Sequence, residues 1–232
     1  GSLILLKKRE KKLIDVMDPR APLKEAFRTI RNSIRFATLD KPPKAIVVTS
    51  SIEGEGKSFV ASNIAISGAL EGKKVLLIDG DLRRPGVANY FALTSKSGLT
   101  NFLVGDADIK DIQQPSGVDK LSIIPTGPIP PDPAKLVESK KMHQLVKDME
   151  SIYDLIIIDS PPLLAASAAV VYGTWTDGML IVVESGRASR RHFSDIIELV
   201  NKANINVIGA VLNKVVGRKT AYYYYQYQYY RK

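Results

Sequence analysis

The chain has 232 residues, of which 45% are hydrophobic, so it can bury the core of one domain of ordinary to large size. It has no cysteine, no apolar run of the roughly 20 residues that cross a membrane, and no signal-peptide pattern, which excludes disulfide scaffolds and predicts a cytoplasmic protein. The net charge is +9, but residues 7–12 and 217–232 each carry +4, so no broad nucleic-acid-binding face is expected.

The N-terminal region divides into a basic tail over 1–20 and the start of a domain. Residues 3–6, which are apolar and precede the basic run, resemble the cytoplasmic exit of a membrane helix, and a frayed tail is the alternative. A helix is predicted to begin at Pro22, because four apolar residues recur on one face: Leu23, Phe27, Ile30 and Ile34. Three charged residues share another side of this helix: Glu25, Arg28 and Arg31. That side is either a solvated face with a weak salt bridge or a contact with another subunit.

The rest of the domain, through residue 216, alternates between strands and helices. Apolar strands are predicted at 45–48, 75–79, 121–124, 154–159, 178–183 and 206–212. Helices are predicted at 59–71, 99–103, 109–112, 142–151 and 191–203, with a further helix starting at Asp132-Pro133. Strands that are apolar on both faces and alternate with helices predict a single α/β domain with a doubly wound, mostly parallel sheet.

A phosphate-binding loop is predicted at residues 50–58, between the first of these strands and a helix. Its glycines let backbone N–H groups turn toward phosphate oxygens, Lys57 can reach the outer phosphates, and the Ser58 hydroxyl can bind Mg²⁺. Ser51 replaces the glycine that usually starts this pattern. Seven residues are expected to contact the nucleotide: Glu53, Gly54, Glu55, Gly56, Lys57, Ser58 and Phe59.

Aspartates end two of the predicted strands. Asp79 and Asp159 occupy strand ends, and Asp81 follows closely. Since ligands of an open parallel sheet collect at the carboxyl ends of its strands, all three are expected to converge beside Lys57 and Ser58. Each aspartate alone could be a cap or turn residue. Together with the loop they predict a site for ATP or ADP with Mg²⁺.

The last strand favours adenine over guanine. GTPases carry Asn-Lys-x-Asp at this position, and the Asp reads guanine. Here Asn213 and Lys214 are present, but Val216 stands where the Asp would be. ATP is therefore the expected nucleotide, with Asn213 as a candidate adenine contact.

The C-terminal tail, residues 217–232, is rich in tyrosine. Seven of the ten tyrosines lie in the last eleven residues: Tyr222, Tyr223, Tyr224, Tyr225, Tyr227, Tyr229 and Tyr230. One interpretation is an aromatic tail that stacks on nucleic acid or associates with itself. The other is a phosphate acceptor with several sites, and an ATP site in the same chain favours it.

Three stretches, 50–58, 76–85 and 153–162, resemble the nucleotide motifs of the bacterial tyrosine kinases. The Glu25, Arg28 and Arg31 pattern resembles that family's oligomerisation motif, and the tail resembles its autophosphorylated cluster. The resemblance covers residues 18–232. Partition and septum-site ATPases share the fold and remain the alternative, but they carry a lysine where Ile52 stands, and they lack the tyrosine tail.

The resemblance implies an ATP-dependent tyrosine kinase that regulates capsule or exopolysaccharide production. It implies that Asp79 orients the tyrosine or accepts its proton, that Lys57 stabilises charge, and that Asp81 and Asp159 hold Mg²⁺ with Ser58. It also implies three partners: other copies of the chain in a ring, a membrane adaptor of the polysaccharide co-polymerase type that activates the kinase at the inner face of the membrane, and a phosphotyrosine phosphatase. Transfer between neighbouring subunits is expected.

Overall fold

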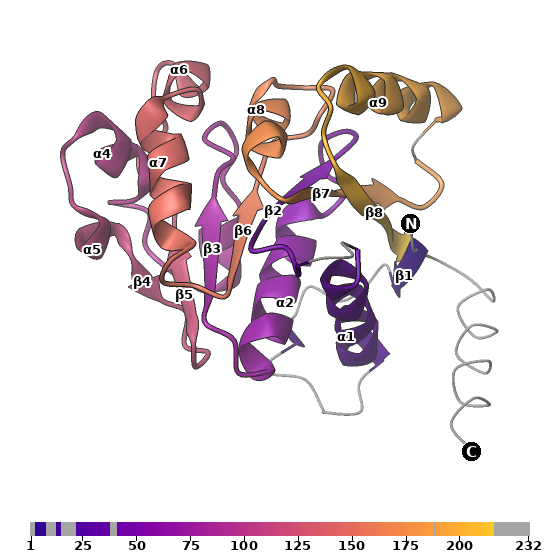
Figure 1. The fold of residues 1–232 in the computed structure, drawn as a ribbon, viewed down its shortest axis with the longest axis horizontal. Coiled ribbons are helices and arrows are strands. Elements are labelled where there is room, and N and C mark those ends of the chain that lie inside the picture. The colour runs from indigo at the N-terminus through magenta and orange to yellow at the C-terminus, as the bar shows by residue number, and fades with distance from the viewer. Residues whose placement is uncertain (1–2, 8–12, 15–21, 38–40, 188, 216–232) are drawn as a thin grey trace.

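The computed structural model describes residues 3–7, 13–14, 22–37, 41–187 and 189–215 (Figure 1). The tyrosine cluster and the basic run at 8–12 lie outside the described residues. Among the residues described, no helix is long and apolar enough to cross a membrane.

The described strands form one eight-stranded sheet in the order β1-β8-β7-β2-β6-β3-β5-β4. Seven strands run parallel, and the short β4 pairs antiparallel with β5. Their bounds are β1 (Leu3–Lys7), β2 (Ala45–Ser50), β3 (Val75–Asp79), β4 (Gln114–Pro115), β5 (Leu121–Ile124), β6 (Leu155–Asp159), β7 (Gly178–Glu184) and β8 (Val207–Val215). The central strands β2, β3 and β6 are buried throughout, as expected for a sheet covered on both faces.

Helices cover both faces of the sheet, so two apolar cores form (Figure 1). One core contains residues of α1 (Pro22–Arg35), α2 (Lys57–Leu70) and α3 (Val87–Tyr90). The other contains residues of α4 (Leu99–Val104), α5 (Ile109–Ile112), α6 (Pro133–Val137), α7 (Lys140–Met149), α8 (Ala168–Trp175) and α9 (Arg190–Lys202). This arrangement confirms the predicted doubly wound α/β domain.

The predicted helix at residue 22 and its apolar face are confirmed. α1 buries Leu23, Phe27, Ile30 and Ile34. Asp132 caps α6 by accepting a hydrogen bond from the Lys135 N–H, at the predicted helix start.

The N-terminal strand β1 was not expected from the sequence. Residues 3–7, which the sequence suggested were a membrane-proximal or frayed tail, pair in parallel with β8. A short apolar segment can form a strand wherever a partner edge is open, and β8 offers that edge in the fold. The two-residue β4 and the helix α8 were also not predicted.

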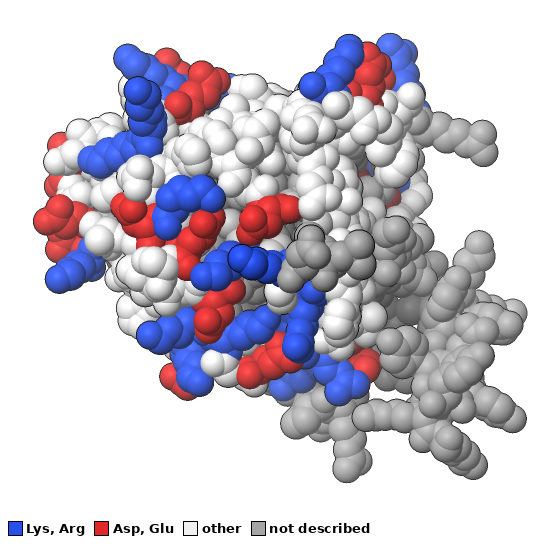
Figure 2. All heavy atoms as spheres, viewed as in Figure 1, with Lys and Arg blue, Asp and Glu red and all other residues white. Residues whose placement is uncertain are grey.

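Charged side chains of both signs are interspersed on the face of the molecule in Figure 2. Lysine and arginine side chains alternate there with aspartate and glutamate rather than forming one continuous basic surface. This pattern agrees with a domain body that is nearly neutral by sequence.

Candidate active site

The loop between β2 and α2 has the backbone that its glycines predict. Gly54 and Gly56 have φ angles of +84° and +92°, a region that glycine enters without steric cost. A Cβ atom on Gly56 would lie 2.3 Å from the Asn213 side-chain nitrogen, so glycine is also required there for space. The loop delivers Lys57 and Ser58 as the first two residues of α2.

The ends of the adjacent strands β3 and β6 bring the predicted charged residues together. Asp79 on β3 is the register partner of Asp159 on β6, and Asp159 is the partner of Val48 on β2. The Lys57 ammonium lies 2.7 Å from a carboxylate oxygen of Asp81 and 3.9 Å from one of Asp159. These side chains therefore form one buried cluster beside the phosphate loop.

Burial and mutual repulsion control the charge of this cluster. Burial, reinforced by the charge of Asp159, raises the pKa of Asp79 to about 8. Burial also raises the pKa of Asp159 to about 6, and the Lys57 charge opposes that rise. Burial alone would lower the pKa of Lys57, but the charges of Asp159 and Asp81 outweigh it and raise the pKa.

The cluster fits an Mg²⁺ ion that arrives with nucleotide phosphates. Both carboxylate oxygens of Asp159 and one of Asp79 are buried and make no hydrogen bond to the described residues. No group of three acidic, His or Cys side chains in the described ranges could hold a metal ion unaided. Mg²⁺ prefers one or two carboxylates with water and phosphate oxygens, which Asp81, Asp159 and Ser58 could complete.

Comparison with known proteins decides the family. Residues 44–208 match the family model described as an AAA domain. The tyrosine-protein kinase YwqD of Bacillus subtilis is 37% identical over 93% of this chain and 92% of its own length. The putative tyrosine-protein kinase CapB of Staphylococcus aureus is 34% identical over 89% of this chain and 91% of its own. The chain belongs to the bacterial tyrosine kinases.

A solved structure agrees with this assignment. The kinase domain of the Escherichia coli tyrosine kinase ETK superposes with a TM-score of 0.86 and 30% sequence identity. The match covers 93% of this chain and 90% of that domain. The bacterial tyrosine kinase fold therefore extends over almost the whole chain.

Asn213, the expected adenine contact, lies against the phosphate loop of this kinase. Its side-chain nitrogen donates to the Glu55 carbonyl at 2.8 Å, and its side-chain oxygen accepts from the Lys214 N–H at 2.8 Å. An adenine contact by Asn213 stays a prediction. Lys214 also contacts the loop. In the sequence, only its position after Asn213 in the Asn-Lys pair marked it as a candidate site residue.

Other supports of the site had no sequence signal. The hydroxyl of Tyr172 donates to the Gly80 carbonyl at 3.1 Å, and the hydroxyl of Thr126 donates to the Asp79 carbonyl at 3.0 Å. These two side chains fix the backbone that carries Asp79 and Asp81. Tyr172 comes from α8, and Thr126 comes from the segment after β5. Neither lies at a sequence distance from the aspartates that would predict a contact.

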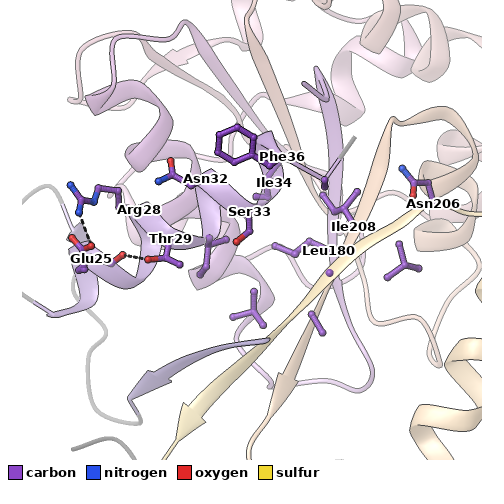
Figure 3. A pocket seen from close by; sticks show the side chains of 16 residues that line it. Glu25, Arg28, Thr29, Asn32, Ser33, Ile34, Phe36, Leu180, Asn206 and Ile208 are labelled. Atoms are coloured by element: carbon purple, nitrogen blue, oxygen red, sulfur yellow. Dashed lines mark hydrogen bonds and ion pairs between the residues drawn. The ribbon is translucent and has the colours of Figure 1, made fainter. Parts of the chain in front are cut away.

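The charged residues of α1 do not share one environment. The guanidinium of Arg28 pairs with Glu25 at 2.7 Å, and both side chains are exposed. Both also line a groove of about 740 Å³ between α1 and β8 (Figure 3). Arg31 instead turns toward α2, where it donates to the Ser67 carbonyl at 3.0 Å and pairs with Glu71 at 3.1 Å.

Proposed function

We propose that this kinase transfers the γ-phosphate of ATP to the tyrosine cluster of its own C-terminal tail, residues 222–230. The observation that carries the proposal is the cluster of Lys57, Asp81 and Asp159 beside the phosphate loop. The same chain has seven tyrosines in its tail. The relatives named tyrosine-protein kinases support the reaction type.

Asp79 would orient the attacking tyrosine hydroxyl and accept its proton. Tyrosine has an ordinary pKa near 10 and aspartate one near 4, so this transfer is strongly uphill for an ordinary aspartate. The raised pKa of Asp79, about 8, makes it a better matched base. Phosphoryl transfer passes through a loose transition state, so holding the two oxygens in line matters more than deprotonation.

Lys57 would stabilise the charge that develops on the transferred phosphoryl group. Its ammonium is held at 2.7 Å by Asp81, so the approaching phosphates compete with that carboxylate. When bound with ATP by Ser58, Asp81 and Asp159, Mg²⁺ would neutralise charge on the phosphate oxygens. Because the cluster is itself acidic, it would repel an anion such as free phosphate that arrives without a cation.

The assembly is proposed to be a ring of copies that contact one another through the exposed Glu25 and Arg28 of α1. A subunit would phosphorylate its neighbour's tail. We propose that the chain acts at the inner face of the membrane with an adaptor of the polysaccharide co-polymerase type, which suits its two basic ends. A phosphotyrosine phosphatase would reverse the modification, and the output would be control of capsule or exopolysaccharide synthesis.

The first experiment is incubation of the pure chain with ATP and Mg²⁺, followed by mass spectrometry of the last eleven residues. Phosphate on several tyrosines is the expected result. A protein that hydrolyses ATP, leaves the tail unmodified and binds DNA or lipid in an ATP-dependent manner would be a partition-type ATPase instead. A tail that stays unmodified without any hydrolysis would make the proposed kinase activity wrong.

A mixing experiment tests transfer between subunits. A full-length Lys57→Met chain serves as an acceptor that cannot act on itself, and an active chain truncated after residue 216 serves as the donor. Phosphate on the Lys57→Met tail is expected. Its absence, with the truncated donor still hydrolysing ATP, would exclude transfer between subunits.

A further inference from the structure

The carboxylate of Glu55 lies inside the protein, although the residue belongs to the phosphate loop. Its side chain is fully buried. One oxygen accepts from the Ser51 hydroxyl at 2.6 Å and from the Ile52 N–H at 3.0 Å. The other accepts from the Glu184 N–H, at the end of β7, at 2.9 Å. This single carboxylate therefore ties the start of the loop to the neighbouring strand.

Two residues of β8 hold the loop from the same side. The Lys214 ammonium donates to the Gly54 carbonyl at 2.5 Å and to the Glu184 carboxylate at 2.9 Å. The Asn213 side chain donates to the Glu55 carbonyl at 2.8 Å. Lys214 has a φ angle of +55°, an uncommon conformation for a residue with a side chain, and tertiary contacts must maintain it.

These contacts determine where the loop's N–H groups point. In a trans peptide the C=O and the following N–H point in opposite directions, and the described residues contain no cis peptide. Because Lys214 and Asn213 hold the Gly54 and Glu55 carbonyls, the N–H groups of Glu55 and Gly56 are turned away from β8. Neither N–H donates a hydrogen bond to any of the residues described. Two adjacent free N–H groups on one side of a loop form an anion-binding concavity.

We propose that Glu55 and Lys214 are positioning residues that hold the phosphate loop in its nucleotide-binding shape before the nucleotide arrives. The sequence places Glu55 among the nucleotide-contacting residues, but its side chain acts away from the nucleotide, on the loop itself. A loop that is already ordered loses less conformational freedom when the nucleotide binds, so its order favours binding. The inference depends on the proposed function in one respect: it takes ATP and ADP to be the ligands of the loop.

The test compares Mg-ADP binding by calorimetry in the whole chain and three variants. In Glu55→Gln, an amide NH₂ replaces one acceptor oxygen and faces an N–H donor. Lys214→Met keeps the length of the side chain and removes its charge. Glu198→Gln is the matched control, since Glu198 pairs with Lys202 at 2.5 Å on the exposed face of α9. We expect the Kd for Mg-ADP to rise about tenfold in Glu55→Gln and about threefold in Lys214→Met, and to stay within about twofold in the control.

Two further readouts separate a positioning role from a loss of overall stability. Hydrogen exchange of residues 51–58 in the nucleotide-free protein is expected to quicken in both loop variants, while exchange in β3 and β6 stays unchanged. At saturating ATP the kcat for tail phosphorylation is expected to stay within about threefold of wild type while KM rises.

Equal Mg-ADP affinity and equal loop exchange in wild type and in both variants would overturn the inference. If Glu55→Gln fails to fold, the comparison of Lys214→Met with wild type still tests the inference. The Lys214 side chain is partly exposed, so its replacement is expected to leave the fold intact. A wild-type chain that binds no Mg-ADP would instead contradict the proposed function itself, and the inference would be wrong with it.

Discussion

The Lys57 ammonium lies 2.7 Å from the Asp81 carboxylate, so the lysine expected to contact the phosphates is paired with an aspartate. The Lys57 side chain is 12% exposed and that of Asp81 is 3% exposed, which makes this a buried ion pair. Removing one partner of such a pair is costly, because the other charge stays buried without compensation. The lysine proposed to act in the chemistry therefore also supports the fold.

Lys57→Met is predicted to lose tail phosphorylation and to lower the free energy of unfolding by about 3 kcal/mol. The double variant Lys57→Met/Asp81→Asn is predicted to regain part of that stability but none of the activity, because it removes one of the two carboxylates that Lys57 compensates, while Asp159 stays buried and the phosphate ligand is still missing. Urea denaturation and tail phosphorylation assays of the three proteins check both statements. A double variant as unstable as Lys57→Met would contradict this account of the pair.

The rate of tail phosphorylation is predicted to rise with pH and to level off above about pH 8. Asp79 must be deprotonated to accept the tyrosine proton, and its pKa is raised to about 8 by burial and by the charge of Asp159. The measurement is kcat/KM for ATP between pH 6 and 9.5. Asp79→Asn provides the control and should lose the inflection near pH 8 together with most of the rate. An unchanged profile in Asp79→Asn would assign the inflection to another group.

Asp79→Asn is also predicted to stabilise the fold above pH 8. Between about pH 4 and pH 8 the folded chain binds more protons at Asp79 than the unfolded chain does, so the free energy of unfolding falls as the pH rises. An amide never ionises and avoids this loss, while its oxygen can still accept from the Gly86 and Val87 N–H groups.

The expected gain is about 4 kcal/mol larger at pH 8.5 than at pH 5, because each pH unit between pH 5 and pH 8 costs the wild type about 1.4 kcal/mol. Thermal unfolding at the two pH values measures it, with the exposed Asp106→Asn as the matched control. A gain of the same size at both pH values would show that ionisation of Asp79 is not its cause.

The sequence predicted the parts of this molecule that depend on local pattern. The continuous apolar strands, the glycine-rich loop and the aspartates at strand ends are all local signals, and the rule that ligands collect at carboxyl ends placed the aspartates near Lys57. Local pattern could also identify the apolar face of α1, since Phe27 and Ile30 recur at helical spacing.

Contacts between residues distant in sequence were not predictable in this way. By sequence, Glu55 is grouped with Glu53 as an expected nucleotide contact, because the two residues are indistinguishable by type, and only the position of β7 determines that Glu55 is buried. Tyr172 supports Gly80 across 92 positions of sequence, with no motif to mark it. Predicting the strand β1 would have required knowing that β8 has an open edge with which it could pair.

Two of the three arginines of α1, Arg28 and Arg31, are predicted to differ in their effect on stability when replaced. Arg31 donates to the carbonyl and the hydroxyl of Ser67 and pairs with Glu71, so Arg31→Ala should loosen α1 from α2. The expected loss is about 2 kcal/mol in the free energy of unfolding, since the freed groups are partly buried. Arg28 is paired with Glu25 on the surface, so Arg28→Ala should change stability by less than about 0.5 kcal/mol.

The same variants distinguish a subunit contact from an internal one. If Glu25 and Arg28 form the proposed contact between subunits, Arg28→Ala should reduce the oligomer in analytical ultracentrifugation while its protomer stays as stable as wild type. Arg31→Ala should lower the melting temperature. It should reduce the fraction of oligomer only to the extent that α1 separates from α2. If Arg31→Ala kept full protomer stability yet dissolved the oligomer, Arg31 would contact the neighbouring subunit rather than α2, and the assignment of its partners to Ser67 and Glu71 would be wrong in the assembled protein.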